Sequence, residues 1–446
     1  MTSKTSSRVV VIGGGLGGLS AAIQLAGAGY RVKLIEKNAH LGGKLNQLQQ
    51  EGFTFDMGPS ILTLPQYFRR LWQTAGSAME DDVPMRAVRP HWRNVFEDGT
   101  VLDLDPDPHK LAAEVRKVGD EDLVRRVMDF LAYAARQYDL MAKGYFEAGL
   151  DTKGDFIRHY GWRDLLAMDY WETMHRGVAR RLRNPYLTDI FDYFIKYVGS
   201  SAYHAPGFMN LMPTIQFRYD LWYVTGGMYR LAEGLERLAR RVGVEIATKT
   251  EVVRLLREEG RVTAAETADG ARLEADVFVS NMEVIPAYRR LLREDEAFLR
   301  TLAPFEPACS GLVLHLGTDR VYPALAHHNF FYARNQAKHF HTVFKEKAIP
   351  EDPTLYVVAP SRSDPSVCPP GGDNIKVLPH IPHLNDKHPA TAEDYRALRD
   401  RVLAKLERMG CPDLRKHIRV EHMWTPEDIA REYYSNAGAI YGVVSD

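Results

Sequence analysis

Cysteine is scarce in this sequence, and long apolar runs are nearly absent. The 446 residues include three cysteines, Cys309, Cys368 and Cys411, and no two of them have the C-x-x-C spacing. Neither a disulfide framework nor a cysteine zinc site can be built from them, so we expect a reducing, cytoplasmic location. The uncharged stretch 9–30 is long enough to cross a membrane, but its dense glycine cluster favours a strand, a tight turn and a helix.

The sequence also lacks an excess of charge of either sign. Lys and Arg total 57 against 58 Asp and Glu, a net charge of −1, so there is no general electrostatic reason to expect a nucleic-acid partner. Hydrophobic residues make up 45% and charged residues 26%, a composition typical of globular proteins rather than disordered ones. A chain of 446 residues is too long for one core and predicts two or three domains.

The first motif is a glycine cluster within a strand–turn–helix–strand pattern. A β-branched run at 8–12 predicts a buried parallel strand, and the glycines at 13–18 predict a tight turn. Small and aliphatic residues at 19–28 predict a helix, and residues 31–35 predict a second strand. This order is typical of a dinucleotide-binding unit, whose phosphates lie against the N-terminus of the helix.

The glycines of this motif have separate roles in such a unit. Gly13 permits the tight turn, Gly15 lets the backbone approach the pyrophosphate, and Gly18 allows the helix and strand to pack closely. Leu16 and Gly17 complete the phosphate-binding loop. A plain structural turn is the alternative, but the strands and helix around the loop favour the dinucleotide.

An acidic residue ends the second strand of the unit. Glu36 lies 18 residues after Gly18, where a carboxylate can accept hydrogen bonds from ribose hydroxyls and disfavours the additional phosphate of NADP. The segments 42–44 (GGK) and 52–60 (GFTFDMGPS) follow and suit a larger cofactor, with a flavin beyond the pyrophosphate. These residues predict FAD rather than NAD as the tightly held cofactor.

At this point the sequence resembles a known family. The strings E-x5-G-G-K at 36–44 and G-F-x-F-D-x-G-P at 52–59 are similar to those of the bacterial carotenoid desaturases and oxidases, FAD flavoproteins of amine-oxidase-like fold. Nearly the whole chain resembles them, through the segments 193–201, 222–227, 280–286, 327–331, 375–382, 424–428 and 438–442. Within the family, the diaponeurosporene (diapolycopene) oxygenase branch is the most similar.

The resemblance implies an α/β fold and a set of cofactor contacts. In this fold a discontinuous Rossmann-like FAD-binding domain carries an inserted α+β substrate domain. The expected contacts, besides the glycine loop, come from the end of the second strand, from two later turns and from one later backbone segment against the adenine: Glu36, Lys37, Gly43, Lys44, Gly58, Pro59, Ser60 and Val252.

The resemblance and the periodicity together predict the domain layout. The FAD-binding domain is expected at 1–75 and 226–285, and the substrate domain at 76–225, which includes a helical region, and at 286–420. Residues 421–446 begin a return to the FAD domain. Similar proteins continue from there into a strand, a loop and a helix that close over the flavin, so we expect the chain ending at Asp446 to hold FAD weakly or not at all.

The activity implied by the resemblance is oxidation of a terminal methyl group of a C30 carotene to an aldehyde, with hydride transfer to the flavin. Two alternatives stay open. One is a diapophytoene or phytoene desaturase, which introduces conjugated double bonds, and the other is a noncatalytic flavin- or carotenoid-binding protein.

A rigid hydrocarbon offers no group for hydrogen bonding, so its site must be a dry apolar tunnel. Aromatic rings suit such a wall and also stabilise a cationic intermediate. The candidates are Phe194, Tyr197, Trp222, Phe330 and Phe331. For any one of these rings, packing in the core is the simpler interpretation.

The sequence identifies neither a catalytic base nor a metal site. His327 and His328 are adjacent, which places them on opposite faces if the segment is a strand. No histidine and carboxylate cluster has the spacing of metal ligands. The catalytic residues and the oligomeric state therefore stay open.

A lipid-soluble substrate together with the absence of a spanning segment predicts a peripheral membrane protein. We expect it on the inner face of the cell membrane, docked through an aromatic and basic patch of the second substrate block, 286–420, near the tunnel mouth.

Overall fold

A four-stranded parallel sheet forms the first unit of the fold. The structure, a computed structural model, describes residues 7–145 and 152–444. The strand order is β13-β1-β2-β9, and every neighbouring pair is parallel. The strands of this sheet are β1 (Arg8–Ile12), β2 (Arg31–Ile35), β9 (Glu245–Ala247) and β13 (Val277–Ser280), and helix α1 (Leu16–Gly27) connects β1 to β2. The predicted strand–turn–helix–strand unit is confirmed, with a helix that begins earlier, at Leu16.

Strand β1 is buried on both faces, as its β-branched run predicts. Val9 and Val11 face a core that helices complete, whereas Val10 and Ile12 face a small antiparallel sheet. The helices of the first core include, besides α1, α2 (Pro65–Gln73) and α11 (Tyr229–Arg241). The small sheet consists of β10 (Val252–Glu258), β11 (Arg261–Thr267) and β12 (Arg272–Glu274).

The strand that follows the small sheet does not extend it. β12 ends at Glu274, and the residues after it form β13, which pairs with β1. The chain thus returns to the parallel sheet here. Two short strand pairs lie between the large units: β3 (Gln47–Gln50) with β4 (Phe53–Asp56), and β5 (Met85–Ala87) with β8 (Trp222–Val224).

A second, larger sheet joins the two blocks expected for the substrate domain. Its path is β19-β15-β18-β17-β16-β6-β7, with β14 paired to β18. β6 and β7 form a hairpin that turns at Asp98-Gly99, and β6 pairs in parallel with β16 from much later in the chain. Its strands are β6 (Trp92–Val95), β7 (Val101–Leu104), β14 (Ser310–Gly311), β15 (Val313–Thr318), β16 (His328–Phe331), β17 (Leu355–Val358), β18 (Asp373–Ile381) and β19 (Ile418–Trp424).

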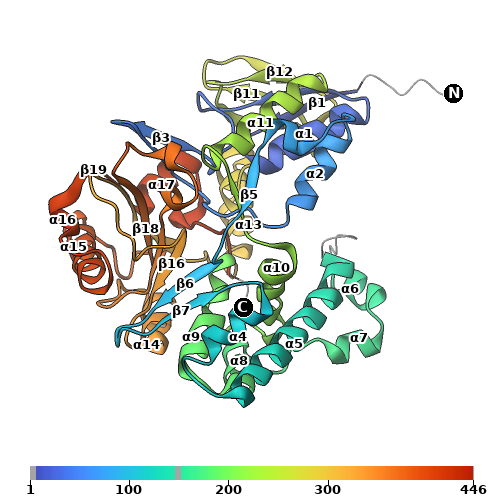
Figure 1. Cartoon of the computed structure of the whole chain (residues 1–446). Coiled ribbons are helices and arrows are strands. Elements are labelled where there is room, and N and C mark those ends of the chain that lie inside the picture. Colours follow the sequence, from blue (N-terminus) through green and yellow to red (C-terminus); the bar gives the residue numbers. More distant parts are fainter. Residues whose placement is uncertain (1–6, 146–151, 445–446) are drawn as a thin grey trace.

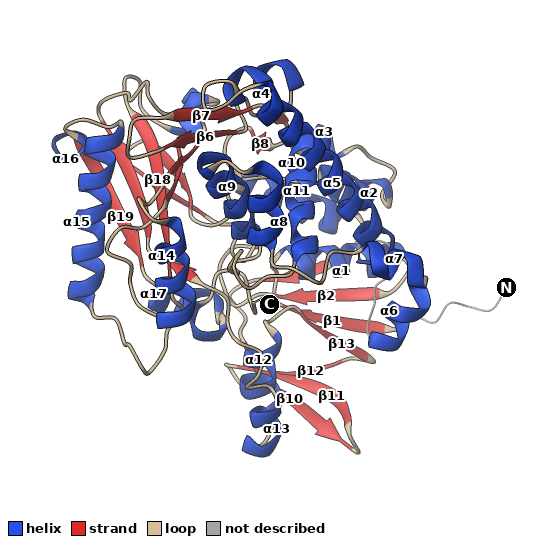
Figure 2. Cartoon of the chain, turned by 90° about the horizontal axis from the view of Figure 1, so that it is seen from below, coloured by secondary structure: helices blue, strands red, loops and turns tan. Residues whose placement is uncertain are grey.

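The two faces of this sheet belong to different cores. Phe330 packs with the helices that follow the first hairpin, whereas Phe331 packs with α15 (Ala392–Met409) on the other face. Alternation along the strand produces this division. Figure 2 shows α15 outside the sheet and α8, α9 and α14 on its opposite side.

The helical region occupies one corner of the molecule, below the parallel sheet in Figure 1. The long helical pattern of the sequence is interrupted several times: α4 (Pro108–Val115), α5 (Glu121–Tyr145), α6 (Lys153–His159), α7 (Trp162–Ala167), α8 (Met174–Leu182), α9 (Pro185–Asp192) and α10 (Met212–Tyr219). The remaining α-helices are α3 (Met79–Asp82), α12 (Val284–Ala287), α13 (Glu296–Thr301), α14 (Gln336–His341), α16 (Leu414–His417) and α17 (Pro426–Tyr433). Within the residues described, no helix has the length and apolar character to cross a membrane.

Candidate functional site

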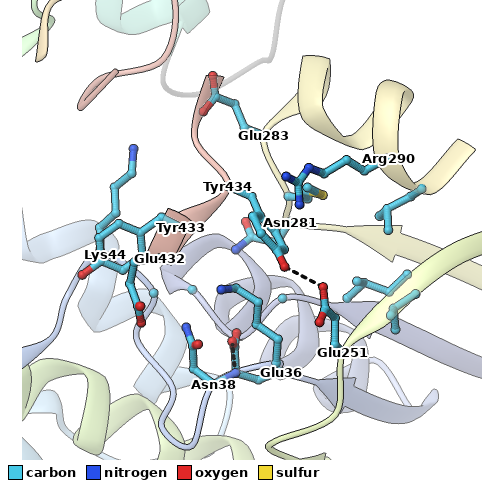
Figure 3. Close-up of a pocket in the computed structure, with 18 of the residues that line it drawn as sticks. Glu36, Asn38, Lys44, Glu251, Asn281, Glu283, Arg290, Glu432, Tyr433 and Tyr434 are labelled. Atoms are coloured by element: carbon cyan, nitrogen blue, oxygen red, sulfur yellow. Dashed lines mark hydrogen bonds between the residues drawn. The ribbon is translucent and has the colours of Figure 1, made fainter. Parts of the chain in front are cut away.

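A cavity of about 790 Å³, here called the nucleotide cavity, lies where β1 and β2 end (Figure 3). Its wall combines the loop after β1, residues 36–38 after β2, residues 250–253 at the start of β10 and residues 281–283 after β13. The carboxyl ends of parallel strands are the usual ligand site of such sheets.

The glycine loop has the conformation that its sequence predicts. Gly13 has a φ of +95°, which favours glycine, and its N–H donates to the Ile35 carbonyl at 2.8 Å. A Cβ on Gly18 would overlap the Gly13 carbonyl oxygen, so the turn and the close packing require glycine at both positions.

Sequence reasoning missed the side chain that lies against this loop. A Cβ on Gly15 would lie 2.8 Å from Nδ2 of Asn281, and a Cβ on Gly17 2.5 Å from its Oδ1. Asn281 follows β13, far away in the chain. Parallel pairing of β13 with β1 brings it to the loop, and the segment 280–286 that contains it, similar to the family, is the signal that could have indicated it.

Glu36 is buried beside the cavity, with 6% of its surface exposed. Its Oε2 accepts from the Gly14 N–H at 2.7 Å and its Oε1 from the Asn38 N–H at 2.8 Å. Each carboxylate oxygen can accept a further hydrogen bond, so ribose hydroxyls fit here. No side chain caps the N-terminus of α1, which leaves backbone N–H groups for a pyrophosphate. The residues present therefore fit a dinucleotide.

A tyrosine lies on the opposite wall of the cavity (Figure 3). Two cations lie against the ring of Tyr434, with Lys37 Nζ at 4.3 Å and the Arg290 guanidinium carbon at 4.0 Å from its centroid. Its hydroxyl donates to Glu251 at 2.6 Å. Val252, the predicted adenine contact, is the next residue in the wall.

A smaller cavity of about 290 Å³, here called the inner cavity, adjoins the nucleotide cavity on the side of the large sheet. The two share wall residues, which are Lys44, Pro59, Tyr433, Ile440 and Tyr441. Apolar and aromatic side chains form most of the inner wall, among them Ile61, Tyr197, Val313, Tyr356, Leu378 and Trp424.

Most of the predicted cofactor residues lie in these two walls. The nucleotide cavity is lined by Gly13, Gly15, Leu16, Glu36, Lys37, Gly43, Lys44, Pro59 and Val252. Gly58 and Ser60 line the inner cavity, whereas Gly17 and Gly18 support the loop from behind. That these residues contact FAD stays a prediction.

Three lysines border the inner cavity. Lys44 donates to the Ile440 carbonyl at 2.7 Å, and Lys376 donates to the Gly58 carbonyl and to the Ser60 hydroxyl. Burial lowers the pKa of Lys376 to about 8, although the nearby Asp56 carboxylate opposes this. Burial lowers the pKa of Lys196 further, to about 7.

The aromatic residues predicted for a substrate wall lie in several places. Tyr197 lines the inner cavity. Phe194 and Phe330 are fully buried, stacked on Trp92 and Tyr356 respectively. Both rings pack in the core, which is the simpler of the two interpretations.

The other two rings of that prediction lie away from the inner cavity. Phe331 belongs to the core on the opposite face of the large sheet, because it alternates with Phe330. Trp222 packs against the core of the parallel sheet. Neither residue contributes to the inner wall.

His327 and His328 do not lie on opposite faces. Their ring centroids are 4.4 Å apart, because β16 begins only at His328. Burial lowers the pKa of His327 to about 3. Among the residues that the structure describes, no group of histidine, cysteine or acidic side chains could hold a metal ion.

Comparison with known proteins adds to this geometry. The model of the family of flavin-containing amine oxidoreductases matches residues 16–434. A 4,4'-diapolycopene oxygenase of Methylomonas sp is 53% identical over 100% of this chain and 90% of its own length. A 4,4'-diaponeurosporene oxygenase of Staphylococcus aureus is 45% identical over 99% of this chain and 89% of its own.

Solved structures share the fold. An oxidoreductase from Methanosarcina mazei has a TM-score of 0.65 at 15% identity and covers 98% of this chain and 90% of its own. A redesigned putrescine oxidase has a TM-score of 0.61 at 14% identity, covering 98% of this chain and 87% of its own. The predicted α/β fold with a Rossmann-like domain is thereby confirmed.

Proposed function

The chain belongs to the family of flavin-containing amine oxidoreductases, and we propose that it oxidises the terminal methyl group of a C30 carotenoid to an aldehyde. It is an oxidoreductase with FAD as its cofactor. The observation that carries the proposal is that two cavities share part of their wall, one fitted to a dinucleotide and the other mostly apolar. The names of its oxygenase relatives support the same substrate class.

Bound FAD supplies the capacity to accept a hydride from carbon. The protein's part is to bind and orient. Glu36 and the N-terminus of α1 hold the ribose and pyrophosphate, and the apolar inner wall excludes water from the polyene. The ring faces of Tyr197 and Tyr356 stabilise positive charge that develops on the chain.

Product analysis tests the reaction. Cells that express this protein and make diapolycopene should accumulate a carotenoid aldehyde, which chromatography and mass measurement identify. A second culture that makes diapophytoene tests the desaturase alternative. Loss of hydrogen pairs from diapophytoene, with no oxygen gained by either substrate, would show that the protein is a desaturase instead.

The carotenoid reaches the protein, in our proposal, from an anionic membrane on its inner face. Large exposed apolar side chains gather on α6, α7 and the residues after them: Ile157 (64% exposed), Trp162 (68%), Leu166 (64%), Tyr170 (40%) and Trp171 (81%). The guanidinium of Arg163 lies 5.2 Å from a Trp162 ring centroid. Apolar and cationic side chains side by side are typical of interfacial docking.

This patch of residues 157–171 lies in the first substrate block, at the outer end of the helical region (Figure 1). From the sequence we expected the membrane-docking patch in the second substrate block, 286–420, instead. Sedimentation with anionic vesicles tests the patch. Replacing both Trp162 and Trp171 by Ser should release the protein, whereas Phe305→Ser, an exposed apolar residue of the second block (55%), should not. Equal binding by all three proteins would exclude this patch.

A further inference from the structure

Lys196 lies in a cage of aromatic rings at the inner cavity. It belongs to the 3-10 helix η1 (Tyr193–Tyr197), which directs its side chain inward so that 7% of it is exposed. Its Nζ lies 4.2 Å from the ring centroid of Tyr356 and 4.4 Å from that of Tyr197. Trp92 and Phe330 follow at 5.2 and 5.3 Å.

What distinguishes Lys196 from its two neighbours is the kind of contact that its amine makes. Lys44 and Lys376 donate to carbonyl oxygens, which favours the protonated ammonium. Within the described part of the chain, the Lys196 amine contacts ring faces and has neither a hydrogen-bond acceptor nor a carboxylate partner. Its titratable neighbours include His328 and His380, whose pKa values burial lowers as well.

Both protonation states of this amine are accessible near neutral pH. Burial lowers its pKa to about 7, because a desolvated ammonium is unfavourable without an anion. The ring faces moderate this effect through cation–π attraction. Lys196 therefore loses its proton much more readily than an ordinary lysine, and a free amine is a nucleophile toward carbonyl carbon.

We propose that Lys196 binds the aldehyde end of a polyene as a reversible imine. The proposal rests on the proposed function, which makes such an aldehyde in the same cavity. The amine nitrogen attacks the carbonyl carbon, a C=N bond replaces the C=O bond, and one water leaves. Hydrolysis returns the amine and the aldehyde. No oxidant or reductant is consumed in either direction.

The geometry suits this ligand for two reasons. The rings of Tyr197 and Tyr356 stack against a flat conjugated chain and stabilise a protonated imine as they stabilise the ammonium. A pure hydrocarbon offers the protein nothing polar to bind, whereas an oxidised end offers one reactive carbon. Lys196 thus gives the cavity a preference for ends that already carry the aldehyde.

Reductive trapping tests the imine. The holoprotein is incubated with crocetin dialdehyde, a shorter linear polyene with an aldehyde at each end, and then with cyanoborohydride, which reduces a protonated imine to a stable amine. Peptide mass mapping should find the polyene on Lys196. Lys44 and Lys376, in the same walls, should remain unmodified and serve as internal controls.

Lys196→Arg keeps the positive charge but cannot form the imine, so the adduct in the cavity should disappear while surface labelling stays as it was. Labelling confined to surface lysines, or undiminished in the Lys196→Arg variant, would overturn the proposal. The assay needs no turnover and is therefore separable from the proposed function. An adduct at Lys196 without oxidation of diapolycopene would support the imine and refute the proposed oxidation. Oxidation of diapolycopene without an adduct would support the proposed oxidation and refute the imine.

Discussion

The nucleotide cavity and the inner cavity share one wall but are built from different material. The loop after β1 contributes backbone to the first, where Gly13 and Gly18 allow a turn and a close packing that a Cβ would prevent. Side chains from distant segments form the second, which includes the buried lysines Lys196 and Lys376. Added side-chain bulk should therefore have its largest effect at the nucleotide cavity, whereas the removal of single charges should alter the inner cavity.

The largest effect is expected from a methyl group at the backbone-built site. Gly18→Ala places its Cβ on the Gly13 carbonyl oxygen, and such overpacking should lower the free energy of unfolding by about 3 kcal/mol. The displaced loop should also lose bound flavin. Thermal unfolding and flavin absorption measure both.

Gly27→Ala is the matched control in the same helix. Its Cβ would lie 3.6 Å from the nearest atom, on Thr74, which is an ordinary contact. The free energy of unfolding should change by less than about 0.5 kcal/mol. If both variants behaved alike, steric exclusion would not explain Gly18.

The second effect concerns Glu36, a buried acidic side chain of the nucleotide wall. In Glu36→Gln, the amide nitrogen would face a backbone N–H of Gly14 or Asn38, since both carboxylate oxygens accept. Loss of a charged hydrogen bond of about 1.5–3 kcal/mol should weaken FAD roughly tenfold to hundredfold. Titration of the apoprotein with FAD measures the affinity.

Asp276→Asn serves as the control for Glu36→Gln. Asp276 also accepts a backbone N–H, from Arg8 at 2.8 Å, but it is exposed and lies outside the nucleotide wall. The Asp276→Asn variant should bind FAD with the same affinity as the parent protein. An unchanged affinity in Glu36→Gln would make that carboxylate a structural residue only.

The same contrast explains what the sequence could predict. The roles of Gly13, Gly18 and Glu36 depend on local backbone geometry, so a short string of residues identifies them. Asn281 and Tyr434 reach the nucleotide cavity through pairing and packing of distant segments, so their place in its wall depends on the whole fold and not on local backbone geometry. Phe330 and Phe331 are alike in sequence, but strand alternation places them in different cores.

The two inner lysines form a matched pair for the third prediction. Lys376→Met removes the donor to Gly58 and Ser60 and leaves Asp56, whose pKa burial already raises to about 6, without its cation. This should cost about 1–3 kcal/mol of unfolding free energy. Lys196→Met removes a buried amine that has no acceptor among the described residues, so stability should stay equal or rise. Denaturant unfolding of both variants measures the difference. An equal loss in the two would show that hydrogen bonding does not separate them.

The smallest effect concerns one ring of the cage. Tyr197→Leu removes a face 4.4 Å from the Lys196 amine and should destabilise the ammonium by about 0.5–1 kcal/mol. The pKa of Lys196, about 7 in the parent, should therefore fall by less than one unit.

The folded pKa of Lys196 is already below that of an unfolded lysine, so the unfolding free energy decreases as the pH falls toward the folded pKa. The variant should extend this decrease to slightly lower pH. Nitrogen NMR of the lysine side chains follows the midpoint directly, with Lys376 as the internal reference that should not move. A rise in the Lys196 midpoint would mean that the ring favours the neutral amine, which would contradict cation–π stabilisation in the cage.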